Sequence, residues 1–264
     1  MSHPTPFTDY AGPIGLRTRG TVLVLPGRGE SQATYQRFGQ RLAVDSYRVR
    51  VLPAPAIEEN RLAASLERIA AHLTEAVAGI GADKLSRPLV LLGSDIGAAA
   101  LAALVAQSSD SPAPGDVPWW PQALILAALP NYGRLGVGDW DDELNVRTQC
   151  TVHRGVLSDD PSAQRGTLAS EVPHALLDAA YSNAVDLPHL LLVGDADPIA
   201  DREALSRATK TLPTARLIVV RGAHHDVLND LQHRSVAAEV VRFLETLRNE
   251  PTLDPIITVQ SSAW

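Results

Sequence analysis

Residues 93–97, Gly-Ser-Asp-Ile-Gly, place an aspartate midway between two glycines. The motif follows an apolar run at 89–92 and precedes a helical pattern. It therefore predicts a sharp turn between a strand and a helix that lifts one side chain above a sheet. Ser94 lies off this centre, because a central Ser94 would need glycines at the positions that hold Leu92 and Ile96. Asp95 is therefore the candidate nucleophile.

An aspartate nucleophile selects a particular chemistry. At an ester or amide carbonyl it would form a mixed anhydride, which is less stable than the starting material. At an sp³ carbon it displaces a halide or opens an epoxide and forms an ordinary alkyl ester. A water molecule activated by a histidine can then hydrolyse that ester at its carbonyl, with the backbone N–H of Ile96 in the oxyanion hole. The simpler alternative is that Asp95 caps the following helix.

An acid and a histidine follow two later strand-like runs. Gly-Asp-Ala-Asp-Pro at 194–198 comes after a leucine-rich run, and we choose Asp197 because Asp195 is better placed to stabilise the turn. Two histidines stand within 223–226 after the next run, and one of them is expected to pair with Asp197, which fixes the ring tautomer. Asp95, Asp197 and a histidine, in this chain order, form the candidate catalytic triad.

Short apolar runs alternate with longer helical patterns along the chain. Runs this continuous are typical of strands buried on both faces, so the pattern predicts a mostly parallel sheet with helices on both sides. The predicted strands span residues 21–25, 47–52, 89–92, 123–129, 190–193 and 217–220, and the predicted helices span 32–44, 58–80, 96–107, 202–211 and 235–248.

The alternation fails once, between residues 130 and 187. This segment is rich in Gly, Asp and Arg, holds one clear helical pattern at 173–182, and is too long for an ordinary connection. We interpret it as a lid over the strand ends, inserted into one core formed by residues 1–129 and 188–264. The tail at 251–264 could add an edge strand or a partner contact, which leaves a homo-oligomer open.

Composition limits the class of protein. The formal net charge is −7 and no basic patch is present, which argues against nucleic acid as a partner. The single cysteine, Cys150, excludes an internal disulfide, and the first 15 residues do not resemble a signal peptide. No apolar stretch is long enough to span a membrane. We therefore expect a cytoplasmic protein that acts on a small molecule, with no cofactor and no metal.

The chain resembles the α/β-hydrolase superfamily over roughly residues 20–249. The segment PGRGESQATYQRFGQRLA is similar to the loop after the third strand, LLGSDIGA to the nucleophile turn, LLLVGDADP to the acid loop and GAHHDVLND to the histidine loop. The overall pattern is similar to lysophospholipase and monoacylglycerol-lipase-like members, which normally carry serine, whereas Asp95 resembles epoxide hydrolases and haloalkane dehalogenases. In the lipase-like pattern the catalytic histidine precedes an acidic residue and Leu-Asn, which selects His225 over His224.

The resemblance implies roles for further residues. Arg28 takes the position whose backbone N–H completes the oxyanion hole. Ile96 stands where dehalogenases typically carry a halide-binding tryptophan, so epoxide opening is favoured over dehalogenation. Epoxide hydrolases usually offer two lid tyrosines to the epoxide oxygen, and Tyr132 and Tyr181 match in residue type and region, although both could equally be packing residues. The Arg28 side chain could bind a substrate carboxylate, or it could pair with Glu30 in a surface loop.

Three functions remain open from the sequence. The first is an epoxide-hydrolase-like enzyme that forms an alkyl ester on Asp95. The second is a lyase, isomerase or esterase-type enzyme in which Asp95 and His225 only transfer protons. The third is a ligand-binding protein that kept the fold and lost catalysis. Retention of Asp197 and His225 argues against the third.

Overall fold

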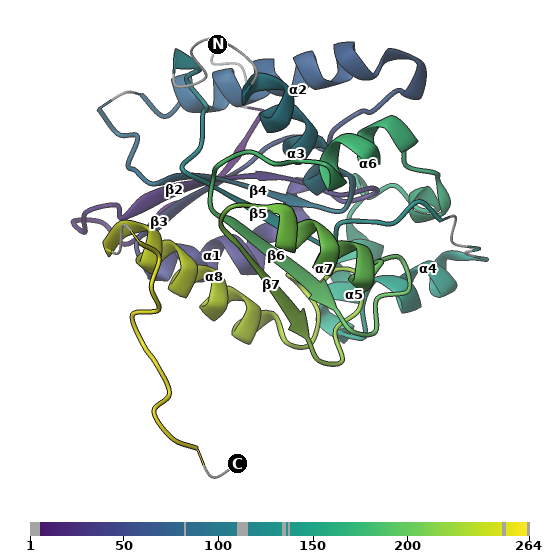
Figure 1. Ribbon diagram of the computed structural model, residues 1–264. Coiled ribbons are helices and arrows are strands. Elements are labelled where there is room, and N and C mark those ends of the chain that lie inside the picture. The colour runs from purple at the N-terminus through teal and green to yellow at the C-terminus, as the bar shows by residue number, and fades with distance from the viewer. Residues whose placement is uncertain are drawn as a thin grey trace.

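The computed structural model describes residues 6–81, 83–109, 116–133, 136, 138–249 and 252–262. Within them, seven strands form one sheet in the order β1-β3-β2-β4-β5-β6-β7 (Figure 1). β1 is antiparallel to β3, and all other neighbouring strands are parallel. The strands are β1 (Thr8–Tyr10), β2 (Gly20–Leu25), β3 (Tyr47–Val51), β4 (Leu89–Ser94), β5 (Ala123–Ala127), β6 (His189–Gly194) and β7 (Ala215–Val220).

Helices cover both faces of this sheet (Figure 1). One apolar cluster joins the sheet to α1 and α8, and the other joins it to α2, α3, α6 and α7. The predicted sheet with helices on both faces is therefore confirmed. The α-helices are α1 (Gln36–Val44), α2 (Leu62–Ala78), α3 (Ile96–Ser109), α4 (Trp140–Arg147), α5 (Thr151–Asp159), α6 (His174–Tyr181), α7 (Arg202–Thr211) and α8 (His233–Asn249); the 3₁₀ turns are η1 (Gln32–Tyr35), η2 (Glu59–Arg61) and η4 (Thr167–Ala169).

The element ends differ from the predictions in a few places. β5 ends at Ala127 rather than at residue 129, because Ala128 has a φ of 51° and turns the chain out of the sheet. β1 was not predicted, since three residues are too few to show a period. The predicted helix at 32–44 begins as the 3₁₀ turn η1, and the one at 58–80 begins with η2.

The segment between residues 130 and 187 holds more helix than predicted. Besides the expected α6, it contains α4 and α5. These two helices carry few apolar residues, and several of their buried positions are polar, namely Glu143, Arg147 and His153. A search for apolar periodicity therefore passes over them.

Of the two possibilities for the tail, an edge strand and a partner contact, the described residues do not form the edge strand. Residues 252–262 form no helix or strand, and most of their side chains are exposed. The remaining residues of the predicted tail, 251, 263 and 264, lie outside the described residues, as do residues 110–115 of the loop before β5. Of the helices that the structure describes, none has the length and apolar character needed to cross a membrane.

The strand order places the candidate site at the carboxyl ends of the interior strands β2 and β4. The chain leaves β2 toward β3 on one side of it, whereas β4 pairs with β2 on the other side. Loops that leave two such strands diverge and open a crevice at the carboxyl ends of the strands. The loop after β2 carries Arg28 and the turn after β4 carries Asp95.

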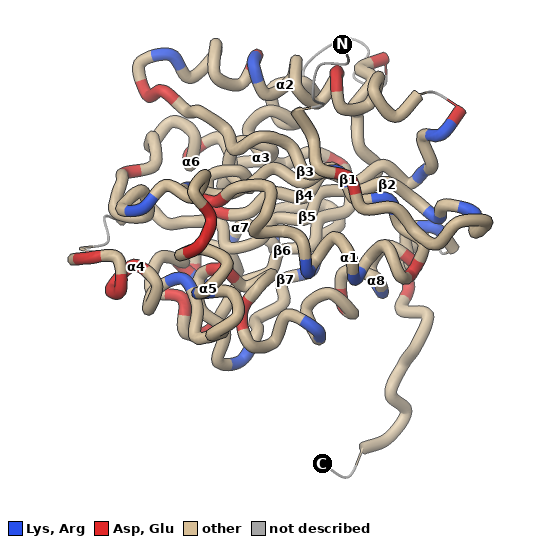
Figure 2. The backbone as a smooth tube through the Cα atoms, turned by 180° about the vertical axis from the view of Figure 1, so that it is seen from behind, with Lys and Arg blue, Asp and Glu red and all other residues tan. Residues whose placement is uncertain are grey.

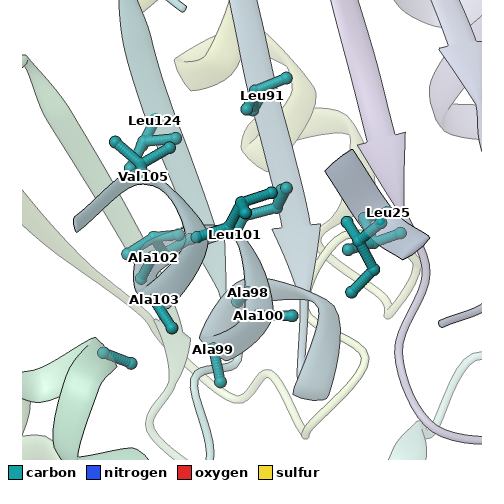
Figure 3. Packing of buried hydrophobic residues seen from close by; sticks show 14 of the residues in the cluster. Leu25, Leu91, Ala98, Ala99, Ala100, Leu101, Ala102, Ala103, Val105 and Leu124 are labelled. Atoms are coloured by element: carbon teal, nitrogen blue, oxygen red, sulfur yellow. The ribbon is translucent and has the colours of Figure 1, made fainter. Parts of the chain in front are cut away.

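Helix α3 lies unusually close to the sheet. Every residue from Ile96 to Val105 is buried, and the small alanines at 98–100 and 102–103 let the helix approach β2, β4 and β5 (Figure 3). Two glycines make the turn before it possible. A Cβ atom on Gly97 would lie 2.4 Å from the carbonyl oxygen of Leu25, and one on Gly93 would lie 2.5 Å from the backbone nitrogen of Ala98. Both glycines are therefore required by close packing of backbone on backbone.

This packing predicts the effect of adding one methyl group. Gly97→Ala should lower the free energy of unfolding by about 1–3 kcal/mol or more, because the contact is with backbone that cannot rotate away. Gly155→Ala is the matched control on α5, where an added Cβ meets nothing within 4 Å. That variant should be unchanged or gain up to about 1 kcal/mol from helix propensity. Urea unfolding of both variants checks this, and equal stability would contradict the proposed role of Gly97.

Candidate active site

Asp95 lies in the turn between β4 and α3. Its φ is +50°, a strained value for a residue with a Cβ atom, and its backbone N–H donates to the carbonyl of Ala127 at 2.9 Å. The neighbouring Ser94 points elsewhere, since its hydroxyl hydrogen-bonds with buried Tyr35. The turn therefore presents the aspartate at the strand ends, and the serine beside it faces the interior.

His225 lies between two carboxylates. Its Nδ1 is 2.9 Å from Asp197 Oδ2, and its Nε2 is 3.3 Å from Asp95 Oδ1. The other oxygen of Asp197 accepts from the backbone N–H of Ile199 at 2.8 Å, which holds that carboxylate in place. Burial alone would lower the pKa of His225, but the interactions of the ring with Asp197 and then with Asp95 outweigh it and raise the pKa to about 10.

The Arg28 side chain lies directly on Asp95. Its Nε donates to Asp95 Oδ2 at 2.8 Å and its Nη2 to Oδ1 at 2.7 Å, a two-point ion pair with both side chains almost fully buried. The backbone N–H of Arg28 also donates to Oδ2, at 2.9 Å. Burial alone would raise the pKa of Asp95, but Arg28 and then His225 lower it well below its usual value. Asp95 is therefore a carboxylate at neutral pH.

Arg28 does not form the pair with Glu30 that the sequence suggested as an alternative. Glu30 instead accepts from the Tyr35 hydroxyl and, at 2.6 Å, from the backbone N–H of Gly27. Burial, followed by the charge of Asp226, raises the pKa of Glu30 to about 7. Glu30 therefore stabilises the loop that carries Arg28 through its hydrogen bonds to Gly27 and Tyr35.

The two predicted lid tyrosines do not contact Asp95. The hydroxyl of Tyr132 donates to Asp178 at 2.9 Å and that of Tyr181 to the carbonyl of Pro130 at 3.1 Å, and the two rings stack on each other. Neither hydroxyl contacts Asp95. Asp195 accepts from the backbone of Gly222 at 2.6 Å, as expected of a residue that stabilises a turn.

A buried ionic network that the sequence analysis missed supports the site. Arg147 of α4 is 2% exposed and bonds to Glu143 at 2.8 Å, to Asp226 at 3.4 Å and to the backbone carbonyl of Arg28 at 2.6 Å. His153 of α5 adds a contact to Asp226 at 2.8 Å. The network thus ties the 130–187 segment to the loops that carry Arg28 and His225. The one sequence signal for it was the (i, i+4) spacing of Glu143 and Arg147.

A hollow of about 350 Å³ lies beside the Arg28 guanidinium, and this size fits a small organic molecule. Both Arg28 and Ile96 line it, together with Glu59, Ser170 and Pro173. Ile96 is the first residue of α3, so its N–H has no partner within the helix. Among the described residues, no group of three or more His, Cys, Asp or Glu side chains is arranged to hold a metal ion.

Comparison with known proteins defines the class. The structure resembles a monoglyceride lipase from Saccharomyces cerevisiae at 14% identity and a TM-score of 0.68, covering 91% of each chain. It also resembles the monoacylglycerol lipase of Paleococcus ferrophilus, at 15% identity and a TM-score of 0.68 over 91% of this chain and 98% of that one. A thermophilic esterase from Thermogutta terrifontis is 20% identical with a TM-score of 0.61, covering 92% and 93% of the two chains. The protein therefore has the α/β-hydrolase fold, as predicted.

The sequence assigns the family within that fold. Residues 17–232 match the profile of the family described as serine aminopeptidase S33, so the chain belongs to this family and is a hydrolase of the α/β-hydrolase class. No curated protein matches the chain by sequence. The family name refers to a serine, whereas this chain has Asp95 at the centre of the turn.

The pKa of His225 predicts how stability depends on pH. A histidine has a pKa of about 6.5 in an unfolded chain, and here the folded value is raised to about 10. Protonated His225 should therefore stabilise the fold fully below pH ~6.5, and this contribution, on the order of a few kcal/mol, should be lost as the pH rises toward ~10.

Urea unfolding between pH 6 and 10 measures this effect as the difference between wild type and His225→Gln. The difference should shrink as the pH rises, and other groups that titrate in this range, including Glu30, are common to both proteins. His174→Gln, on the exposed face of α6, is the control and should parallel wild type. Parallel curves for wild type and His225→Gln would contradict the prediction.

Proposed function

We propose that this chain hydrolyses a small organic molecule through a covalent ester on Asp95, and that the reacting group is an epoxide. The observation that carries the proposal is the different setting of the two oxygens of Asp95. Oδ2 accepts from the backbone N–H of Arg28 at 2.9 Å, and Oδ1 faces His225 Nε2 at 3.3 Å. This difference supports Oδ2 as the future ester carbonyl and Oδ1 as the attacking oxygen.

In the first step Asp95 Oδ1 attacks an epoxide carbon, and the bond from that carbon to the epoxide oxygen breaks. The oxygen leaves as an alkoxide and takes a proton. Because the pKa of His225 is about 10, its ring carries that proton at neutral pH. The products are a hydroxyalkyl ester on Asp95 and a neutral His225.

The second step hydrolyses this ester. Esterification removes the negative charge of Asp95, so the pKa of His225 falls and its ring becomes a better base. The ring takes a proton from water, and the hydroxide attacks the ester carbonyl. The resulting oxyanion on Oδ2 accepts hydrogen bonds from the backbone N–H groups of Arg28 and Ile96. Collapse expels the diol with the proton from His225, and the ring regains a proton from the restored carboxyl group of Asp95.

Arg28 has to rotate off Asp95 for substrate to reach Oδ1. Its guanidinium covers both carboxylate oxygens, and its Nη1 donates to the carbonyls of Leu168 and Ser170 in the 130–187 segment. We propose that this segment is a lid and that the displaced guanidinium stabilises the developing alkoxide. Arg28 would then do what Tyr132 and Tyr181 were expected to do, because their hydroxyls bond elsewhere. The backbone N–H of Arg28 keeps its place when the side chain turns.

A second candidate is a ligand-binding protein without turnover. The buried two-point pair of Arg28 with Asp95 favours it, since this pair closes the nucleophile. Proton-transfer catalysis by Asp95 receives less support, because a carboxylate whose pKa is lowered this far is a weak base. Turnover measurements separate these alternatives.

The covalent mechanism predicts opposite defects in two variants. With styrene oxide as probe, Asp95→Asn should lose turnover, because an amide nitrogen replaces the attacking oxygen. His225→Gln should form the ester more slowly, because it lacks the proton donor of the first step, but should still accumulate an adduct with the mass of one epoxide on Asp95, because ester hydrolysis lacks its base. Peptide mapping by mass spectrometry identifies the modified residue. Full activity of Asp95→Asn, without deamidation, would remove Asp95 as nucleophile, and binding of probe with no turnover in wild type would favour the second candidate.

An isotope experiment distinguishes covalent from general-base catalysis. In a single turnover with excess enzyme in ¹⁸O water, the label should enter the Asp95 carboxylate, and the diol should carry the unlabelled enzyme oxygen. Many turnovers by the same enzyme serve as the positive control, because labelled Asp95 then transfers its oxygen to later product. Labelled diol with unlabelled Asp95 in the first turnover would replace the covalent mechanism by direct attack of water.

A further inference from the structure

A second hollow, of about 560 Å³, lies between α1 and the starts of α5 and α8, away from Asp95. It is lined by three arginines and one histidine: Arg37 and Arg41 from α1, and His233 and Arg234 from the first turn of α8. Positions of Lys and Arg lie close together where α1 and α8 run side by side (Figure 2). Among the described lining residues, Asp45 supplies the sole carboxylate.

These guanidinium groups lack acidic partners. Arg37 donates to the backbone carbonyl of Asn229 at 2.6 Å and to the sulfur of Cys150 at 3.4 Å. Within the part of the chain that the structure describes, Arg41 and Arg234 form no hydrogen bond or ion pair, and Arg41 Nε is buried without a partner. Buried donors are nearly always satisfied in folded proteins, so the unpaired Nε of Arg41, a residue that lines the hollow, leaves this side chain short of an acceptor.

The N-terminal end of α8 adds to this excess of positive charge. The N-terminal end of a helix carries partial positive charge and favours anions. Here α8 begins with His233 and Arg234, and a positively charged side chain is unfavourable at this end of a helix. The pKa of His233 is lowered by partial burial and then by the charges of Arg37, Arg41 and Arg234. The repulsion among these groups would be relieved by a bound anion.

We propose that this hollow binds a doubly charged tetrahedral oxyanion, a phosphate group that is either free or part of a small phosphate monoester. Arg41 and Arg234 would donate to its oxygens from the two sides of the hollow. The N–H groups of Arg234 and Ser235 in the first turn of α8 would add further donors, since that of His233 already bonds to the carbonyl of Asp230. The protein as a whole has a formal net charge of −7, so retention of an anion here would come from this local cluster. The site is independent of the chemistry proposed for Asp95.

Calorimetric titration of the full chain at constant ionic strength tests the proposal, with inorganic phosphate in one arm and glycerol 3-phosphate in the other. We expect saturable binding of one anion per chain. Tighter binding of the ester would identify a phosphorylated small molecule as the ligand, and equal binding would identify free phosphate. Absence of saturable binding in both arms would overturn the proposal.

Variants locate the site. Arg41→Gln and Arg234→Gln should each weaken binding at least about tenfold, because each removes charge-assisted hydrogen bonds. Arg207→Gln, on α7 at the other face of the sheet, removes the same charge and should bind as wild type. Arg37 is left unchanged because it also holds Asn229 in the histidine loop. Binding by Arg41→Gln and Arg234→Gln at the wild-type affinity would place the anion elsewhere.

The titration of His233 gives a readout that does not depend on affinity. The charged groups around it are Arg37 and Arg41 of α1, Arg234 on α8 and His153 on α5, with Asp45 at the end of α1 across the hollow. Sulfate is the probe here, because its charge stays constant near neutral pH. In NMR titrations, saturating sulfate should raise the pKa of His233 in wild type and have a smaller effect in Arg41→Gln. A pKa of His233 that sulfate leaves unchanged would contradict the assigned position.

Discussion

The burial of the Asp95 carboxylate is the constraint on which the rest of the site depends. An ionised carboxylate loses several kcal/mol of hydration when it is removed from water, so it remains charged only where cations and N–H donors replace that water. Here the replacements are the guanidinium and backbone N–H of Arg28 and the ring of His225. Each of these groups must itself be held in place. The positions of the surrounding loops follow from that requirement.

The residues that hold His225 and Arg28 in place are themselves charged and buried. Asp197 holds the far side of the His225 ring, and Arg147 bonds to the carbonyl of Arg28 and to Asp226, the residue after His225. Because Arg147 belongs to α4, this helix of the 130–187 segment is connected to both sides of the site by buried polar contacts, whereas α6 of the same segment packs on α3 through apolar residues. Buried ion pairs of this kind specify one arrangement strongly, since removal of one partner leaves an uncompensated charge.

An aspartate and a serine at the centre of the turn differ in the bonds that they can attack. In this structure the strained turn holds Asp95, the backbone N–H of Arg28 donates to its carboxylate, and His225 lies opposite. A carboxylate attacks an sp³ carbon productively and an ester carbonyl unproductively, so the same scaffold is suited to a different bond. Fold similarity to lipases and an esterase therefore does not transfer their substrates to this chain. The chemistry proposed here rests on the residue at the centre of the turn.

The sequence alone determined strands β2 to β7, the chain order of Asp95, Asp197 and His225, and the turn at Asp95. These features depend on local apolar periodicity and on the spacing of two glycines. Tertiary structure decided the partner of Arg28, the position of the two tyrosines and the network around Arg147. Most of those pairings join residues far apart in the chain: 67 positions for Arg28 with Asp95, 79 for Arg147 with Asp226 and 46 for Tyr132 with Asp178. A guanidinium can bond to any carboxylate that the fold brings within reach. The local sequence pattern does not say which carboxylate a given arginine binds. The packing of the loops at the carboxyl ends of the strands decides it.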